Sequence, residues 1–307
     1  MSIMRYDLAI DVTAAIPADQ PLTDPIHVTT TVFANPLELP ENPTVVLAIA
    51  GATYHRRYWD LQPPGREGYS QAAWLARRGV IFVACDYLGG GDSTRPDDGD
   101  FMTLEVAADA AHAVYEQVRK RLEEGELVDE LPPLSGVTYI GLGQSLGGLI
   151  TIVQQGKYGD YSGVGLLGAS PEFAAEVELP PLANLPMYHG APREQFLSLF
   201  HVPDVPEDLL AYDEAECHTV LSRVTGADAL TPNLTTPFAH QIDVPVFLAF
   251  GTHDVSTHPR SEPASYPRSS DLTVVVMPDM AHMHNFADTR ERLWRRFVDW
   301  LPTVTTV

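Results

Sequence analysis

Ser145 lies in a pattern that is typical of a nucleophilic serine on a sharp turn. The pattern is Gly-x-Ser-x-Gly at residues 143–147, with a further glycine at position 148. It follows the apolar run 137–142, which predicts a buried strand, and precedes the helical pattern 146–156. A strand that passes directly into a helix turns sharply, and small residues two positions on either side let the two elements approach. The pattern therefore predicts a serine hydroxyl raised above the end of a sheet.

A serine hydroxyl is a weak nucleophile near neutral pH, so the prediction requires a general base and a carboxylate that orients the base. Asp254 is a suitable carboxylate, because it follows the apolar run 244–250, which predicts another buried strand. Glu172 follows the run 164–168 and is a reserve acid at a different strand end. We expect Asp254 to be the acid.

Two histidines, His282 and His284, are candidates for the base. Both follow the apolar run 272–277 and leave the same predicted loop, so spacing alone does not rank them. We favour His282 and keep His284 as the alternative. The predicted catalytic residues then occur in the order serine, acid, histidine, which is one of the orders in which such triads are found.

Two other interpretations use the same residues. Neighbouring imidazoles bind zinc, so His282 and His284 could form a metal site with His253 or His258 as a third ligand. A metal site would leave Ser145 and its glycine-rich turn unexplained. Ser145 could also be an ordinary helix cap, but the strand, turn and helix around it favour the nucleophile.

A serine hydrolase also needs hydrogen-bond donors for the oxyanion of the tetrahedral intermediate. The backbone N–H of Leu146 begins the predicted helix, where the helix dipole adds to its effect. The second donor should come from the loop after the apolar run 44–50. We predict the N–H of Ala52, with that of Thr53 as the alternative.

A parallel sheet would bring these residues together. Apolar runs alternate with helical patterns along the chain, which predicts a mostly parallel central sheet with helices on both faces. Two alternating stretches near the N-terminus predict an antiparallel pair of strands at the edge. The predicted strands are 6–12, 26–33, 44–50, 80–86, 137–142, 164–168, 244–250 and 272–277, and the predicted helices are 69–76, 104–122, 146–156 and 289–301.

The stretch 171–237 interrupts this alternation. It is rich in proline and irregularly helical, so we interpret it as a cap (lid) inserted over the C-terminal edge of the sheet, between the core segments 1–170 and 238–307. We expect an apolar, rather roomy pocket beneath it. The expected substrate-binding residues are Thr53, Tyr54, Met187, Tyr188, Phe196 and Phe200, and Phe173 and Tyr212 belong to the same aromatic set of the cap.

The composition of the chain limits the kinds of molecule that we expect it to bind. The chain has 307 residues with 41 acidic and 19 basic side chains, and its formal net charge of -22 repels nucleic acid and anionic lipid headgroups. The first ten residues lack the pattern of a secretion signal, and no apolar run is long enough to cross a bilayer. Cys85 and Cys217 alone imply no disulfide framework. We therefore expect a cytoplasmic enzyme with a small-molecule partner, and leave open whether it forms a homo-oligomer.

The chain resembles the α/β-hydrolase superfamily from about residue 28 to about residue 301. Residues 85–93, followed by Arg95 and a proline, are similar to the family's Asp-x-x-Gly-x-Gly-x-Ser loop, and residues 143–148 are similar to its nucleophile turn. His282 follows an alanine where the family usually has Gly-His, which supports His282 as the base. Ala50 stands where the family commonly has a histidine, which leaves the second oxyanion donor open.

This resemblance implies a two-step acyl transfer that needs no metal or organic cofactor. His282 would take the proton of Ser145, Asp254 would hold the imidazole in the correct tautomer, and the N–H groups of Leu146 and Ala52 would bind the oxyanion. Serine at the nucleophile position argues against haloalkane dehalogenases and epoxide hydrolases, which have aspartate there.

The expected reaction is hydrolysis of a carboxylic ester or lactone of a bulky apolar compound. The stretch 282–286 is similar to bacterial lactonases that open the macrolactone zearalenone. Hydrolysis of amides, thioesters or carbon–carbon bonds and cofactor-free haloperoxidase-like activity are alternatives on the same fold. A hydrolase-fold receptor that binds a small molecule without turnover is an alternative of another class.

Overall fold

A single large sheet forms the centre of the computed structural model, which describes residues 3–20, 24–172, 180–191, 193–203 and 205–305. Six neighbouring strands of this sheet run parallel, and the two N-terminal strands add an antiparallel edge. The predicted mostly parallel sheet is therefore confirmed. Its eight strands, in spatial order, are β1 (Met4–Asp11), β2 (His27–Ala34), β4 (Val80–Cys85), β3 (Thr44–Ile49), β5 (Thr138–Gln144), β6 (Gly163–Leu167), β9 (Val246–His253) and β10 (Leu272–Ala281).

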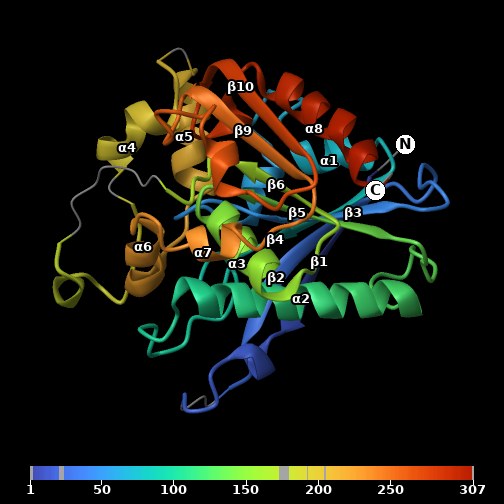
Figure 1. The fold of residues 1–307 in the computed structure, drawn as a ribbon, viewed down its shortest axis with the longest axis horizontal. Helices are drawn as coiled ribbons and strands as arrows, with labels where there is room; N and C mark the ends of the chain where they lie inside the picture. Colours follow the sequence, from blue (N-terminus) through green and yellow to red (C-terminus); the bar gives the residue numbers. More distant parts are fainter. Residues whose placement is uncertain (1–2, 21–23, 173–179, 192, 204, 306–307) are drawn as a thin grey trace.

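Helices cover both faces of the sheet, as Figure 1 shows with α1 and α8 on one side and α2 on the other. Each face of the sheet has its own hydrophobic core. Alternate residues of β3 pack in one core or the other, because successive side chains of a strand point to opposite faces. Val45 and Leu47 pack in the cluster that includes α2 and α3, and Val46 and Ala48 pack in the cluster that includes α1 and α8. The helices are α1 (Gln71–Ala76), α2 (Leu104–Glu124), α3 (Leu146–Tyr158), α4 (Arg193–Phe200), α5 (Glu207–Glu216), α6 (Arg223–Ala229), α7 (Thr236–Ala239) and α8 (Arg290–Thr305).

The boundaries of α2 follow from its sequence. The side chain of Thr103 caps the helix by accepting a hydrogen bond from the Val106 N–H at 3.2 Å. Gly125 ends the helix with a φ of 72°, a conformation that costs glycine little. The predicted helix 104–122 is thus present and two residues longer.

The segment 171–237, hereafter the inserted segment, lies between β6 and the last two strands of the sheet. It contributes α4, α5 and α6 and a small two-stranded sheet of β7 (Tyr188–His189) and β8 (Leu221–Ser222), which the irregular helical pattern did not predict. In Figure 1 these helices lie beside the sheet and away from α8. Residue Phe173 lies outside the described residues.

A buried ion pair ties together the loops that follow β3 and β4. The Arg56 guanidinium lies 2.7 Å from Asp86, whose side chain is fully buried, and also 2.7 Å from the more exposed Asp92. The backbone N–H groups of Arg56 and Asp92 donate to Asp86 as well. Gly91 packs directly on this carboxylate, because an added Cβ would lie 2.1 Å from it. The glycine-rich loop 89–93 is therefore wrapped around a buried aspartate.

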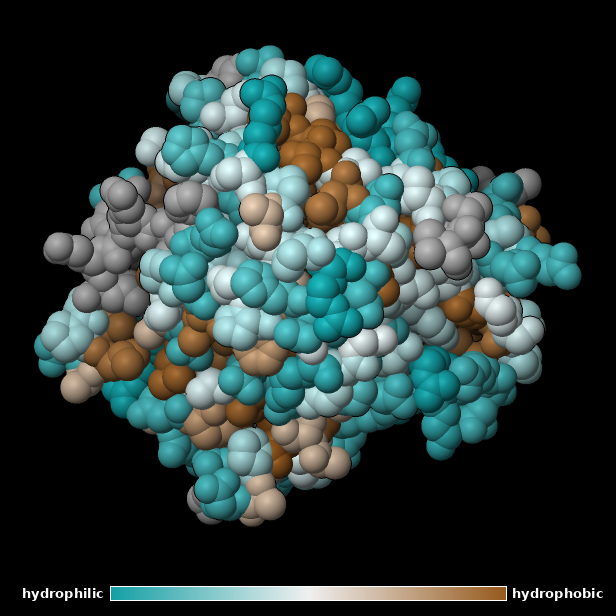
Figure 2. All heavy atoms as spheres, in the orientation of Figure 1, coloured by the Kyte–Doolittle hydropathy of each residue, from teal (hydrophilic) through white to brown (hydrophobic). Residues whose placement is uncertain are grey.

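The outer surface is mainly polar. Figure 2 shows hydrophilic residues over most of one face, with apolar patches between them. Leu182, Leu197 and Leu234 are exposed apolar residues of the inserted segment. Within the described part of the chain, no helix has the length and hydropathy needed to span a membrane. Cys85 and Cys217 are buried, and neither forms a disulfide within the described residues.

Gly147→Ala tests the close contact between α3 and β3. An added Cβ would lie 2.0 Å from the Ile49 carbonyl oxygen, so we expect a loss of about 3 kcal/mol in the free energy of unfolding, at the upper end of the usual overpacking cost. Gly159→Ala is the control, because its Cβ would meet nothing within 4 Å and only its φ of 66° adds a cost, of about 1 kcal/mol. Urea unfolding compares the two variants. A smaller loss in Gly147→Ala than in Gly159→Ala would contradict the close contact.

Candidate active site

Ser145 is held on a strained turn where β5 passes directly into α3. Its φ of 52° and ψ of -118° lie outside the regions that residues with a side chain ordinarily adopt. The Ser145 N–H donates to the Leu167 carbonyl of the neighbouring strand at 2.9 Å. An added Cβ on Gly143 would lie 2.3 Å from the carbonyl oxygen of Gly147. Glycine is therefore required at position 143 for the turn to be this tight, and the contact of Gly147 with the Ile49 carbonyl requires it at position 147.

The loop after β3 approaches the same turn. An added Cβ on Gly51 would lie 3.1 Å from the Cβ of Ser145, so the two backbones pass close to each other. Thr53 in this loop has a φ of 61°, and its N–H donates to the Tyr87 hydroxyl at 3.1 Å. The Thr53 N–H, one of the two candidates for the second oxyanion donor, is therefore already used in a hydrogen bond.

Two backbone N–H groups next to Ser145 remain available. The N–H of Leu146 is the first of α3 and has no partner within the helix. The N–H of Ala52 has no hydrogen-bond partner among the described residues. Both residues line the cavity described below. This arrangement favours Ala52 over Thr53 as the second donor.

Asp254, in the loop after β9, receives hydrogen bonds from both candidate histidines. The Nδ1 atom of His282 lies 2.6 Å from Asp254 Oδ1, and the Nε2 atom of His284 lies 2.7 Å from Oδ2. The backbone N–H groups of Val255 and Gly251 donate to the same two oxygens at 2.8 and 2.9 Å. The side chains of Asp254 and His284 are fully buried, and that of His282 is 3% exposed.

The end of β10 places His282 against the inserted segment. The register of β10 against β9 shifts between Met277 and Ala281, so the strand runs four residues beyond the predicted 272–277. The N–H of His282 donates to the Leu199 carbonyl of α4 at 3.0 Å. The buried Gln144 donates from its side-chain amide to the His282 carbonyl at 2.9 Å. Gln144 was not predicted from the sequence, because only the tertiary structure shows that its side chain is buried and reaches the backbone of His282.

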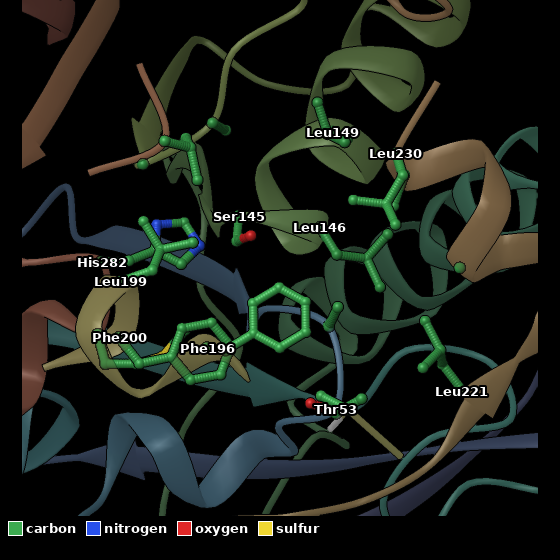
Figure 3. Close-up of a pocket in the computed structure, with 18 of the residues that line it drawn as sticks. Thr53, Ser145, Leu146, Leu149, Phe196, Leu199, Phe200, Leu221, Leu230 and His282 are labelled. Carbon is green, nitrogen blue, oxygen red and sulfur yellow. The ribbon is translucent and has the colours of Figure 1, made fainter. Parts of the chain in front are cut away.

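One cavity brings the candidate residues together. Ser145 and His282 both line it (Figure 3). Of the predicted substrate-binding residues, Thr53, Phe196 and Phe200 line it as well. The cavity encloses about 880 Å³, including its open mouth. Phe200 stacks on His282 with ring centroids 6.0 Å apart. Further apolar walls come from Leu146, Leu149, Leu199, Leu221, Leu230 and Met283.

The cavity also distinguishes the two histidines. His282 lines it, whereas His284 lies behind Asp254 with its ring fully buried. Glu172, the reserve acid, accepts a hydrogen bond from the Ser265 hydroxyl instead. Both histidines bond to Asp254, and the described residues contain no group of three or more side chains able to hold a metal ion.

The hydroxyl of Ser145 makes no hydrogen bond to either histidine within the described part of the chain. In Figure 3 one nitrogen of the His282 ring points toward Ser145, while the serine oxygen is turned to the side of Leu146. Because the Nδ1 atom of His282 is bonded to Asp254, the nitrogen that faces the serine is Nε2. Hydrogen bonds of this kind are often long in unliganded enzymes and tighten when substrate binds.

Three residues predicted to contact substrate are not among the lining residues. Tyr54 is fully buried, and its hydroxyl donates to Asp213 at 2.8 Å. The hydroxyl of Tyr188 donates to a backbone carbonyl in the loop 96–99, and the sulfur of Met187 accepts from a backbone N–H of the same loop. These side chains attach the inserted segment to the loops that follow β3 and β4. Tyr212 similarly accepts a hydrogen bond from a backbone N–H.

The charge of Asp254 is stabilised by its neighbours. Burial alone would raise the pKa of its carboxyl group, but the charge and hydrogen bond of His282, together with the hydrogen bond from His284, hold the pKa well below its usual range. An ionised carboxylate only accepts hydrogen bonds. In its neutral form each imidazole therefore carries its proton on the nitrogen that faces Asp254, Nδ1 of His282 and Nε2 of His284, which leaves Nε2 of His282 as an acceptor toward Ser145.

Comparison with known proteins gives structural similarity without sequence similarity. No family model and no curated protein sequence matches the chain. A thermophilic esterase from Thermogutta terrifontis aligns with a TM-score of 0.62 over 98% of this chain and 99% of its own, at 16% identity. A bromoperoxidase from Bacillus anthracis aligns at 0.63 over 98% and 100%, at 17% identity. An enol-lactonase from Burkholderia xenovorans aligns at 0.66 over 90% and 97%, at 18% identity.

The lowered pKa of Asp254 predicts a pH-dependent stability. Because the folded-state pKa lies below the unfolded value of about 4, the stabilisation is present at neutral pH and is lost as the pH falls below about 4. We expect the free energy of unfolding to fall more steeply with acidification in the wild type than in Asp254→Asn. Asp288→Asn, which changes a carboxylate that is 94% exposed, should follow the wild type. Parallel pH profiles of wild type and Asp254→Asn in urea titrations would disprove this.

Proposed function

We propose that this chain, which has the α/β-hydrolase fold, hydrolyses a carboxylic ester or lactone through an acyl-enzyme on Ser145. One observation carries the proposal, namely that Ser145 and His282 line one cavity while Asp254 holds His282 from behind. The identities to the solved structures are too low to transfer an activity, so the proposal rests on the site itself.

In the proposed mechanism, the Ser145 side chain turns toward His282. The Nε2 atom of His282 takes the hydroxyl proton as the serine oxygen attacks the substrate carbonyl carbon. The bond from that carbon to the alcohol oxygen then breaks, and His282 returns the proton to the departing alcohol. Water repeats the sequence on the acyl-enzyme, with His282 again as the base, and releases the carboxylic acid and free Ser145.

The negative charge of each tetrahedral intermediate needs donors that are already in place. The N–H groups of Leu146 and Ala52 fit this role, because both residues line the cavity and neither N–H has a hydrogen-bond acceptor among the residues that the structure describes. Asp254 stays ionised and stabilises the imidazolium of His282, as the low pKa of its carboxyl group supports. The strained backbone of Ser145, with a φ of 52°, accompanies a position at the wall of the cavity.

The side chains that line the cavity support a particular class of substrate. Apolar side chains dominate it, and no lysine or arginine occurs among the described residues that line it. An anionic group of a substrate would therefore find no permanent counter-charge among these residues, only the imidazoles of His189 and His282, and burial of an unpaired charge costs several kcal/mol. The net charge of -22 adds long-range repulsion. We propose a neutral, bulky ester or lactone, and a macrolactone such as zearalenone is one member of that class.

In this proposal the inserted segment acts as the cap of the pocket. Phe196 and Phe200 of α4 line the cavity next to His282, and Leu221 and Leu230 line it from the later part of the segment. Thioesterase, carbon–carbon hydrolase and haloperoxidase-like reactions would use the same residues. A receptor without turnover would bind in the same cavity, and it would be distinguished by stabilisation with ligand in the absence of product formation.

Ser145→Ala tests the nucleophile. We expect it to abolish labelling by a fluorophosphonate probe and to reduce kcat for a chromogenic ester by about 10⁴-fold or more. Ser170→Ala is the matched control, because Ser170 lines the same cavity and should not be the labelled residue. Circular dichroism and thermal unfolding check that both variants fold. Persistent labelling of a folded Ser145→Ala variant would exclude Ser145 as the nucleophile.

A matched pair of substrates tests the neutral cavity. One 4-nitrophenyl ester carries a neutral alkyl acyl chain, and the other carries an acyl chain of equal length that ends in a carboxylate. We expect kcat/KM to be at least about tenfold higher for the neutral ester, since burial of an unpaired charge is costly. Measurements at low and high ionic strength separate this effect from long-range repulsion, which salt screens. Equal kcat/KM values would refute the proposed substrate class.

A further inference from the structure

We infer that His284 is a positioning residue, which fixes the carboxylate of Asp254 so that Asp254 can orient His282. His284 does not line the cavity, so it would not contact substrate. The inference rests on the proposed function, because it assigns a role in the same site. Its geometry can also be tested without any measurement of turnover.

Hydrogen-bond donors fill the acceptor positions of the Asp254 carboxylate. A carboxylate offers about four acceptor positions, two on each oxygen. Oδ1 receives His282 Nδ1 and the Val255 N–H, and Oδ2 receives the Gly251 N–H and His284 Nε2. Without His284, Oδ2 would keep a single donor in a place where water does not reach. The carboxylate could then rotate about its Cβ–Cγ bond, and its contact with His282 would loosen.

Among the described residues, the His284 imidazole has a single hydrogen bond, and its partner is Asp254. Its Nδ1 atom is buried and has no partner among the described residues. Burial of an imidazole costs free energy that an apolar side chain of similar size would not. The hydrogen bond to Asp254 offsets part of that cost. This indicates that the ring positions the carboxylate and does not only fill space in the core.

A buried hydrogen-bond network fixes the backbone next to His284, in addition to the bond from the His284 N–H to the His282 carbonyl at 3.1 Å. The next residue, Asn285, donates from its side-chain amide to the Tyr58 carbonyl at 3.0 Å and accepts from the Trp294 indole N–H at 2.9 Å. Asn285, Tyr58 and Trp294 are all buried. His284 therefore holds Asp254 from a rigid support, whereas His282 must exchange a proton with Ser145.

The test compares His284→Met with His284→Gln. The amide nitrogen of glutamine reaches about as far as imidazole Nε2 and can donate to Asp254, while methionine has similar length and no donor. With the neutral chromogenic ester, we expect His284→Met to lower kcat by about 10- to 100-fold and to change KM by less than about twofold. Residues that hydrogen-bond to the ligands of a catalytic metal have effects of this size on activity. His284→Gln should recover most of the kcat. Fluorophosphonate titration gives the concentration of active sites in each sample.

A double-mutant cycle shows whether His284 acts through Asp254. In an Asp254→Asn background, His284→Met should cause no further loss of kcat, because the carboxylate that it positions is already gone. Full additivity of the two losses would overturn the inference. Wild-type kcat in His284→Met, or a loss in His284→Gln equal to that in His284→Met, would also overturn it.

Nitrogen-15 NMR of the wild-type histidines needs no variant and no turnover. We expect the His284 proton on Nε2, shifted downfield by the bond to Asp254, and no proton on Nδ1. A proton on Nδ1 instead of Nε2 would overturn the inference even if every variant failed to fold. If the wild type neither hydrolyses esters nor reacts with the fluorophosphonate, the proposed function fails, and this NMR result still decides the geometry of His284 and Asp254.

Discussion

The carboxylate of Asp254 carries a charge that is removed from water, and the protein must supply every hydrogen bond that water would have made. Four donors do so, two from the backbone and two from the imidazoles of His282 and His284. This requirement determines the tautomer of His282 and keeps its Nε2 free to face Ser145. The position of Asp254 therefore controls which nitrogen in the site can accept a proton.

Backbone contacts place the serine opposite that nitrogen. The turn at Ser145 is possible only because Gly143 and Gly147 leave no side chain between β3, β5 and α3. Gln144 then links this turn to the backbone of His282, across 138 positions of sequence. A buried amide thus holds the turn at Ser145 and the end of β10 in fixed relation, although no hydrogen bond joins Ser145 to His282 within the described part of the chain.

The inserted segment has two physical roles in the structure. Through Tyr54 and Asp213 it is fastened to the loop that carries Ala52, and through α4 it bonds to the backbone of His282. Its apolar side chains, Phe196 and Phe200 among them, give the cavity its character. The same segment that shapes the pocket therefore also supports the loops of the candidate active site. Displacement of the segment would disturb both.

Local sequence patterns were enough to predict the alternation of strands and helices, the mostly parallel sheet and the turn at Ser145, because hydrophobic period and glycine spacing are local properties. The resemblance of short motifs to the α/β-hydrolase superfamily added the specific fold. The fold prediction is confirmed, although β7 and β8 were not predicted. Only the tertiary structure separated His282, which faces the cavity, from His284, which lies behind Asp254. It also showed that Tyr54 is buried away from the cavity. Such outcomes depend on contacts between residues far apart in the chain, and residue spacing does not record them.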